Sequence, residues 1–110
     1  MEFIATESGF DDGMGGASNA ADTKDHHYVL FGRQTEAQHR ECGGVYFEFD
    51  DQIHGSVDSV RRVEIRDDVV EFELKEGQRI IVRRGMEESQ WSGFLTGIRD
   101  AFGGHIVRRA

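Results

Sequence analysis

The sequence has no proline, one cysteine and no apolar run long enough to cross a membrane. The single Cys42 cannot form an internal disulfide, so the fold must be stable without cross-links, which fits a reducing compartment. The first residues, MEFIATESGFDD, lack the basic segment followed by an apolar one that marks a secretory signal. We therefore expect a soluble, cytoplasmic protein whose turns are formed by its 14 glycines and its Asp, Asn and Ser clusters.

Positive charge is also scarce, since 13 Lys and Arg stand against 21 Asp and Glu, for a net charge of -8. Residues 1–25 carry six acidic residues and one Lys, and residues 41–60 carry five acidic residues and no Lys or Arg, so each segment sums to -5. Nucleic acids are bound by clustered Lys and Arg, so this balance argues against a nucleic-acid partner. A basic protein would instead be attracted, and its association would be accelerated.

The residues that are present suffice for one hydrophobic core. The chain has 110 residues with eight Phe, two Tyr and one Trp, which predicts a single domain spanning residues 1–110. Apolar and polar residues alternate with the period of a half-buried strand in several segments, joined by short turns at Asp67-Asp68 and at Gly77. These segments are HHYVLFGR, GVYFEFDD, RRVEIR, VVEFELKEG and QRIIVRR. Their order predicts an antiparallel β-meander sheet.

The last part of the chain changes to a helical period, which predicts a helix over about residues 86–102. Glu87 and Glu88 suit its first turn, and Gly103 suits its end. Gly93 and Gly97 lie inside it at a cost of about 1 kcal/mol each relative to Ala, which is tolerable where the helix must approach the sheet closely. The apolar stripe comprises Trp91, Phe94, Leu95, Ile98 and Phe102. The predicted class is α+β, with the sheet packed by one C-terminal amphipathic α-helix.

Three segments lack a clear period. Residues 9–25 are rich in Gly, Asp and small side chains and are expected to form a long flexible loop, with a hairpin around Met14 as the alternative. The segment DQIHGS, residues 51–56, is expected to be a turn region. The final HIVRRA is expected to be a tail or an added edge strand.

No catalytic or metal site is predicted, and no cofactor. His26 and His27 would point to opposite faces of a strand, and His39 with Cys42 forms only half of a zinc motif. Glu48 and Asp50 lie on the polar side of their strand, where a solvated face is favoured over an acid–base pair. An ion pair between Arg33 and Glu48 across the sheet is expected if their strands are antiparallel neighbours. We therefore do not expect an enzyme.

The order of HYVLFGRQ, GVYFEFDDQ, RRVEIRDDVVEFEL and WSGFLTGIRDAF resembles the immunity protein 10 family of bacterial polymorphic toxin systems. The likeness covers about residues 26–102, and its most specific parts are residues 28–33, a strand that ends in Arg33, and residues 44–52 with Tyr46, Glu48 and Gln52. Residues 9–25 fit poorly. The resemblance implies a cytosolic protein that binds a cognate toxin, often one with a basic face, and blocks it by occlusion without turnover.

We therefore expect the acidic residues of the middle of the chain to form the partner-binding surface. They are Glu41, Glu48, Asp50, Asp51 and Asp58. The alternative is a small-ligand-binding domain or small enzyme that uses the polar face of the sheet with Tyr46, Glu48 and Arg33, or a cavity between sheet and helix. A deep pocket with perturbed carboxylates would favour it. A homodimer through an exposed strand edge, such as residues 79–84, is compatible with either function, although Arg79, Arg83 and Arg84 would discourage it.

Overall fold

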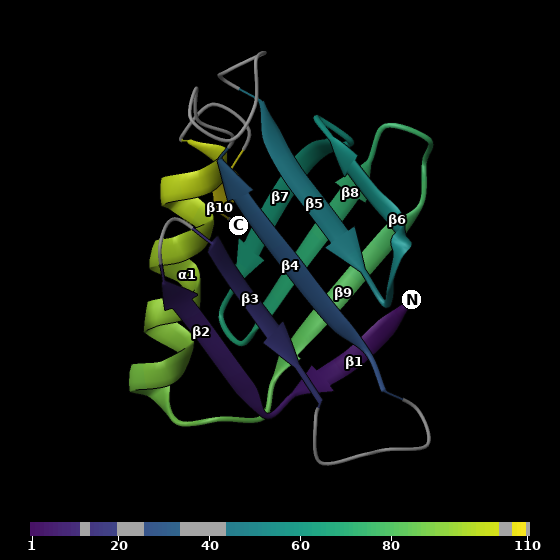
Figure 1. Cartoon of the computed structure of the whole chain (residues 1–110). Coiled ribbons are helices and arrows are strands. Elements are labelled where there is room, and N and C mark those ends of the chain that lie inside the picture. Colours follow the sequence, from purple (N-terminus) through teal and green to yellow (C-terminus); the bar gives the residue numbers. More distant parts are fainter. Residues whose placement is uncertain (12–13, 20–25, 34–43, 104–106, 110) are drawn as a thin grey trace.

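The computed structural model describes residues 1–11, 14–19, 26–33, 44–103 and 107–109 (Figure 1). One helix and ten strands are present in these ranges. They are β1 (Glu2–Ala5), β2 (Glu7–Asp11), β3 (Met14–Ser18), β4 (Tyr28–Arg33), β5 (Val45–Phe49), β6 (Asp51–Val57), β7 (Val60–Arg66), β8 (Val69–Leu74), β9 (Arg79–Arg84), α1 (Glu88–Phe102) and β10 (Val107–Arg109).

The strands form two five-stranded sheets. The meander sheet has the order β2-β3-β4-β5-β6, and each neighbouring pair in it is antiparallel. The mixed sheet has the order β1-β9-β8-β7-β10, in which the outer strands β1 and β10 run parallel to β9 and β7. In Figure 1 the strands of the meander sheet cross in front of those of the mixed sheet, and α1 runs beside β2.

The predicted α+β class, with antiparallel meanders and one C-terminal helix, is confirmed. The strands nevertheless divide between two sheets, because both sheets have an apolar inner face and one 15-residue helix is too small to cover ten strands. The two faces meet in one core, where the ring centroid of Phe72 lies 4.9 Å from that of Phe47 and 6.2 Å from that of Phe31. Trp91 of α1 belongs to the same core, as does Phe102.

The helix begins at Glu88, two residues later than expected, with Glu87 as its N-cap, and it ends before Gly103, whose φ is 75°. The predicted apolar stripe is buried except for Leu95, which is half-buried. Gly97 has the close contact expected of a helical glycine, because a Cβ there would lie 2.8 Å from the Phe10 ring. Gly93 is exposed with no atom within 4 Å of such a Cβ, so close approach does not explain it.

Residues 9–25 do not form the expected loop throughout. They contain the end of β2 and the whole of β3, which form the hairpin that was the alternative there; residues 20–25 lie outside the described part. The glycines and small side chains of the hairpin show no alternation of apolar and polar residues. The hairpin is stabilised by its pairing with β4 and its packing against α1.

Two further expectations about strands need correction. Residues 51–56 were expected to be a turn but belong to β6, which pairs with β5. Residues 79–84 were expected to be a free edge, but β9 lies between β1 and β8, so a dimer cannot form through it. The strand β1, at the start of the chain, pairs with β9 along this edge. Residues 107–109 do add an edge strand, beside β7.

Candidate functional site

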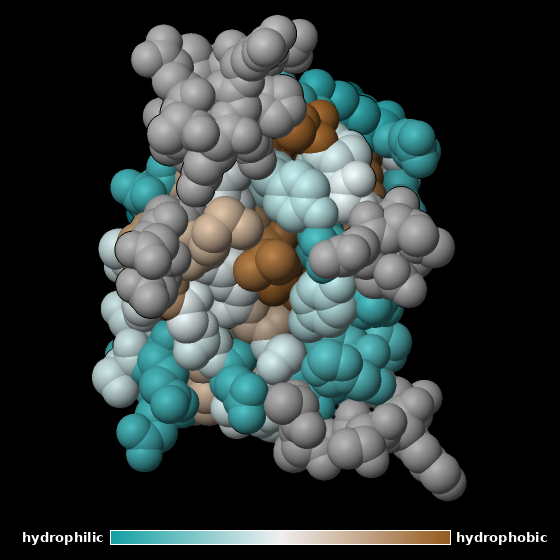
Figure 2. Space-filling model, in the orientation of Figure 1, coloured by the Kyte–Doolittle hydropathy of each residue, from teal (hydrophilic) through white to brown (hydrophobic). Residues whose placement is uncertain are grey.

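A shallow hollow lies on the outer face of the meander sheet. Its volume is about 630 Å³, and it is lined by residues 7–10, 14–18, 26 and 28–30, which come mainly from β2, β3 and β4. We call it the outer hollow. Apolar side chains gather near the middle of this face in Figure 2, surrounded by weakly polar ones. The floor is low because β3 has glycine where a side chain would project: a Cβ on Gly16 would lie 2.5 Å from the Val29 carbonyl oxygen.

Two tyrosines and a glutamate lie on the same face, on the β5 side of the hollow. The register places Leu30 of β4 opposite Glu48 of β5 and Gly32 opposite Tyr46. The Tyr46 hydroxyl donates a hydrogen bond of 2.5 Å to Glu48 Oε1, and the Tyr28 hydroxyl donates to Glu48 Oε2. We call Tyr28, Tyr46 and Glu48 the Tyr–Glu–Tyr cluster.

Glu48 is therefore not on a solvated face, as was expected. Only 6% of the residue is exposed, because the two tyrosines cover its carboxylate. The backbone register places Arg33 opposite Val45, three residues away from Glu48 along β5, and the Arg33 side chain lies outside the described part, so the expected pair stays a prediction. Sequence alternation assigned Glu48 to the correct side of the strand but gave no sign of what covers it there.

Glu48 has no cationic partner among the side chains that the structure describes, which excludes those of Arg33 and residues 51–54, and this sets it apart from the other buried acid found there. Glu71, 8% exposed, lies 3.5 Å from Arg66 and 3.6 Å from Arg79. Glu48 has hydrogen bonds from two neutral hydroxyls instead. Burying a carboxylate without an opposite charge is costly, because the hydration that it loses is only partly replaced.

The cluster also fixes the protonation of Tyr46. The hydrogen bond to Glu48, followed by burial and the negative charge of Glu48, raises the pKa of Tyr46 from 10.0 to about 12. Tyr46 therefore stays protonated near neutral pH and donates its hydrogen bond to Glu48. A phenol that holds its proton this tightly is a poor general base or nucleophile.

Asp50 has a structural role beside the cluster. It lies in the tight β5–β6 connection with a φ of 61°, accepts a hydrogen bond of 3.1 Å from the Tyr28 backbone N–H, and lies 2.9 Å from His27 Nδ1. The His27 ring in turn stacks on Phe3, with ring centroids 5.9 Å apart. Asp50 therefore anchors the start of β4 to the end of β5.

Of the five acidic residues of the predicted partner surface, the structure describes the side chains of three, which do not all lie together. Glu48 and Asp50 are linked through Tyr28, whereas Asp58 is exposed at the other end of β5, where its carboxylate accepts a hydrogen bond of 3.0 Å from the Val45 backbone N–H. Asp51 is placed in β6 by its backbone. Glu41 lies outside the described residues, as do His39 and Cys42.

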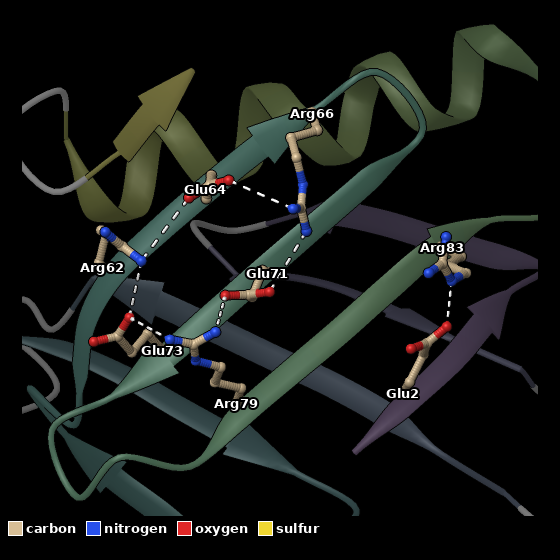
Figure 3. A network of polar contacts seen from close by, with 8 residues as sticks. All are labelled: Glu2, Arg62, Glu64, Arg66, Glu71, Glu73, Arg79 and Arg83. Atoms are coloured by element: carbon tan, nitrogen blue, oxygen red, sulfur yellow. Dashed lines mark hydrogen bonds and ion pairs between the residues drawn. The ribbon is translucent and has the colours of Figure 1, made fainter. Parts of the chain in front are cut away.

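The outer face of the mixed sheet is also charged, but there arginines and carboxylates pair with one another (Figure 3). Glu73 lies 3.0 Å from Arg62, and Glu64 lies 3.6 Å from Arg66. Each acid that Figure 3 draws contacts at least one arginine. This face balances its own charges, in contrast to the Tyr–Glu–Tyr cluster.

The residues of β2 and β3 that line the outer hollow were not predicted as site residues, because this hairpin was expected to be a loop. Met14, around which the alternative hairpin was centred, was the one available signal. Within the described ranges, no three His, Cys, Asp or Glu residues are grouped so that they could hold a metal ion. No helix in those ranges is long and apolar enough to span a membrane.

Comparison of the chain with models of known protein families, with curated proteins and with solved structures finds no match.

Proposed function

We propose that the chain is an immunity protein that binds a cognate bacterial toxin in the cytoplasm and neutralises it by occlusion, without turnover. The observation that carries this proposal is the open outer hollow flanked by two ordered tyrosines. Tyrosine is enriched among the residues that dominate protein–protein binding energy. Because Glu48 already orders both hydroxyls, their side chains lose less entropy when a partner binds.

Charge supports a basic partner. The chain carries a net charge of -8, and the described residues that line the outer hollow include Glu7 but neither Lys nor Arg. A toxin with a basic substrate-binding face would be steered toward this side. The resemblance of residues 26–102 to the immunity protein 10 family favours the same role.

The decisive experiment is co-expression with the toxin encoded beside this chain. We expect the chain to restore growth and to co-purify with the toxin domain as a stoichiometric complex. Tyr46→Ala should weaken that complex, whereas Lys75→Ala, on the exposed turn between β8 and β9, should not. Failure of the chain to bind or protect against any toxin encoded beside it would reject the proposal.

The alternative, a small-ligand-binding domain or small enzyme, has one observation in its favour. The volume of the outer hollow, about 630 Å³, falls within the range of ligand sites. Its lining comes from one face of a sheet, however, and ligand sites usually enclose most of the ligand. A metabolite that raises the melting temperature of the wild type but not of Leu30→Ala would support this alternative over the immunity role.

A further inference from the structure

We propose that the Tyr–Glu–Tyr cluster is the receptor for an arginine side chain of the protein partner. The inference rests on the proposed function, because it names the chemistry by which the partner engages this same face. The arginine supplies a positive charge that no described side chain brings to Glu48, and it does so through the Tyr46 hydroxyl that covers the carboxylate.

Glu48 differs in its charge environment from the carboxylates of the mixed sheet. Glu71 and Glu73 each lie within 4 Å of two or more arginines. Glu71 is about as buried as Glu48, and Glu73 is more exposed. Among the side chains that the structure describes, the acids of the mixed sheet are thus paired with arginines, whereas Glu48 of the meander sheet, buried at least as deeply, has no cation beside it. A carboxylate in that state binds a cation more strongly than one in water, because the low local dielectric strengthens the attraction.

The geometry allows a relay of hydrogen bonds. Tyr46 donates its hydroxyl proton to Glu48, so its hydroxyl oxygen keeps lone pairs that accept hydrogen bonds. A guanidinium offers five N–H donors in one plane and also stacks on aromatic faces. Its aliphatic stem would cross the outer hollow, over Leu30 and Met14, while Gly16 keeps the floor low.

An arginine of a protein is favoured over a free amine because the outer hollow is open. A small cation there would stay largely hydrated and gain little. An arginine held by a docked protein receives the rest of its binding energy from the surrounding surface. The planar guanidinium also combines hydrogen bonding with stacking on an aromatic ring, which the compact ammonium of lysine does less well.

The test uses the full chain and a pair of short peptides. In one peptide arginine alternates with glycine, and in the other citrulline, which is neutral and nearly the same shape, replaces each arginine. We expect the arginine peptide to give saturable amide shifts at Gly16, Leu30 and Tyr46, with affinity about tenfold or more above that of the citrulline peptide, a difference typical of one charged hydrogen-bonded contact. Equal shifts with both peptides, or none with either, would overturn the inference.

Two variants of the cluster and one control assign the effect to it. Glu48→Gln keeps the shape and removes the charge, and it should abolish the preference for arginine over citrulline. Glu76→Gln removes the same charge from the exposed turn between β8 and β9 and should leave the preference intact. Tyr46→Phe keeps the ring but loses the hydroxyl and should weaken arginine binding, which checks the relay even if Glu48→Gln folds poorly.

The outcome separates this inference from the immunity role. If the toxin binds the wild type and Glu48→Gln equally well and the peptides are not distinguished, the arginine receptor is wrong while the immunity role stands. If the arginine peptide binds as described but no toxin encoded beside the chain does, the receptor stands and the immunity role is wrong.

Discussion

Glu48 is a carboxylate surrounded by tyrosines and by the apolar face around Leu30, and such surroundings stabilise negative charge poorly. Binding sites often keep groups of this kind at the expense of stability. We expect Glu48→Gln to raise the free energy of unfolding by about 1 kcal/mol, because relief from burying the charge exceeds the loss of two charge-assisted hydrogen bonds. Urea denaturation measures this difference.

The control is Glu71→Gln. Glu71 is nearly as buried but pairs with Arg66 and Arg79, so we expect its substitution to lower stability, by no more than about 1 kcal/mol because both arginines are half exposed. Opposite signs for the two substitutions would support the comparison. A loss of stability in Glu48→Gln equal to that in Glu71→Gln would contradict it.

Tyr46 provides a second prediction at the residue scale. Its pKa is about 12 in the folded chain against an ordinary 10.0, so the folded state binds this proton more tightly than the unfolded chain does. The stability that it contributes is complete below pH 10 and is lost as the pH rises to about 12. Because the chain has two tyrosines, subtracting the phenolate absorbance of Tyr46→Phe from that of the wild type isolates this titration. In Glu48→Gln the isolated midpoint should move down toward 10; an unchanged midpoint would exclude Glu48 as the cause.

At the scale of elements, the two glycines of α1 provide a matched pair. Gly93→Ala should raise the free energy of unfolding by about 0.5–1 kcal/mol, because alanine is the better helix former and its Cβ meets no atom within 4 Å. Gly97→Ala should lower it, because displacing the Phe10 ring costs about 1–3 kcal/mol, more than the helix gains. Thermal unfolding of both variants checks the two signs, and equal gains would show that the Phe10 ring yields freely.

The same elements show how far the sequence predicts this fold. The helical stripe from Trp91 to Phe102 and the alternation in β7 and β8 both carry their period in apolar residues, and both were predicted correctly. The β2–β3 hairpin was not, because its strands are stabilised by neighbours distant in sequence. The division into two sheets was missed for the same reason: alternation identifies an inward side but not what that side packs against.

The candidate site has the same limitation. Tyr46 and Glu48 are two residues apart, so their common face was evident, but Tyr28 reaches Glu48 only through the register of β4 and β5. Burial of Glu48 depends on that tertiary contact, which a single sequence does not encode locally. The outer hollow depends further on β3, whose glycines carry no hydrophobic signal.

At the scale of the whole molecule, the net charge of -8 and the self-neutralised face of the mixed sheet together concentrate the attraction for a basic partner elsewhere on the surface. Exposed acidic residues beside the outer hollow should then affect the association rate of the partner more than its dissociation rate. We expect Glu7→Lys, at the border of the outer hollow, to slow association with the toxin several-fold at low salt and to change dissociation little.

The salt dependence of the association rate tests this electrostatic attraction. Because the Debye length falls from about 30 Å at 0.01 M to about 8 Å at 0.15 M ionic strength, the difference in association rate between the wild type and Glu7→Lys should shrink as salt is added. Stopped-flow mixing at several salt concentrations measures it, with Glu76→Lys on the distant β8–β9 turn as the control for net charge alone. If Glu76→Lys slows association as much as Glu7→Lys does, the overall charge of the chain attracts the partner and the outer hollow does not direct its approach.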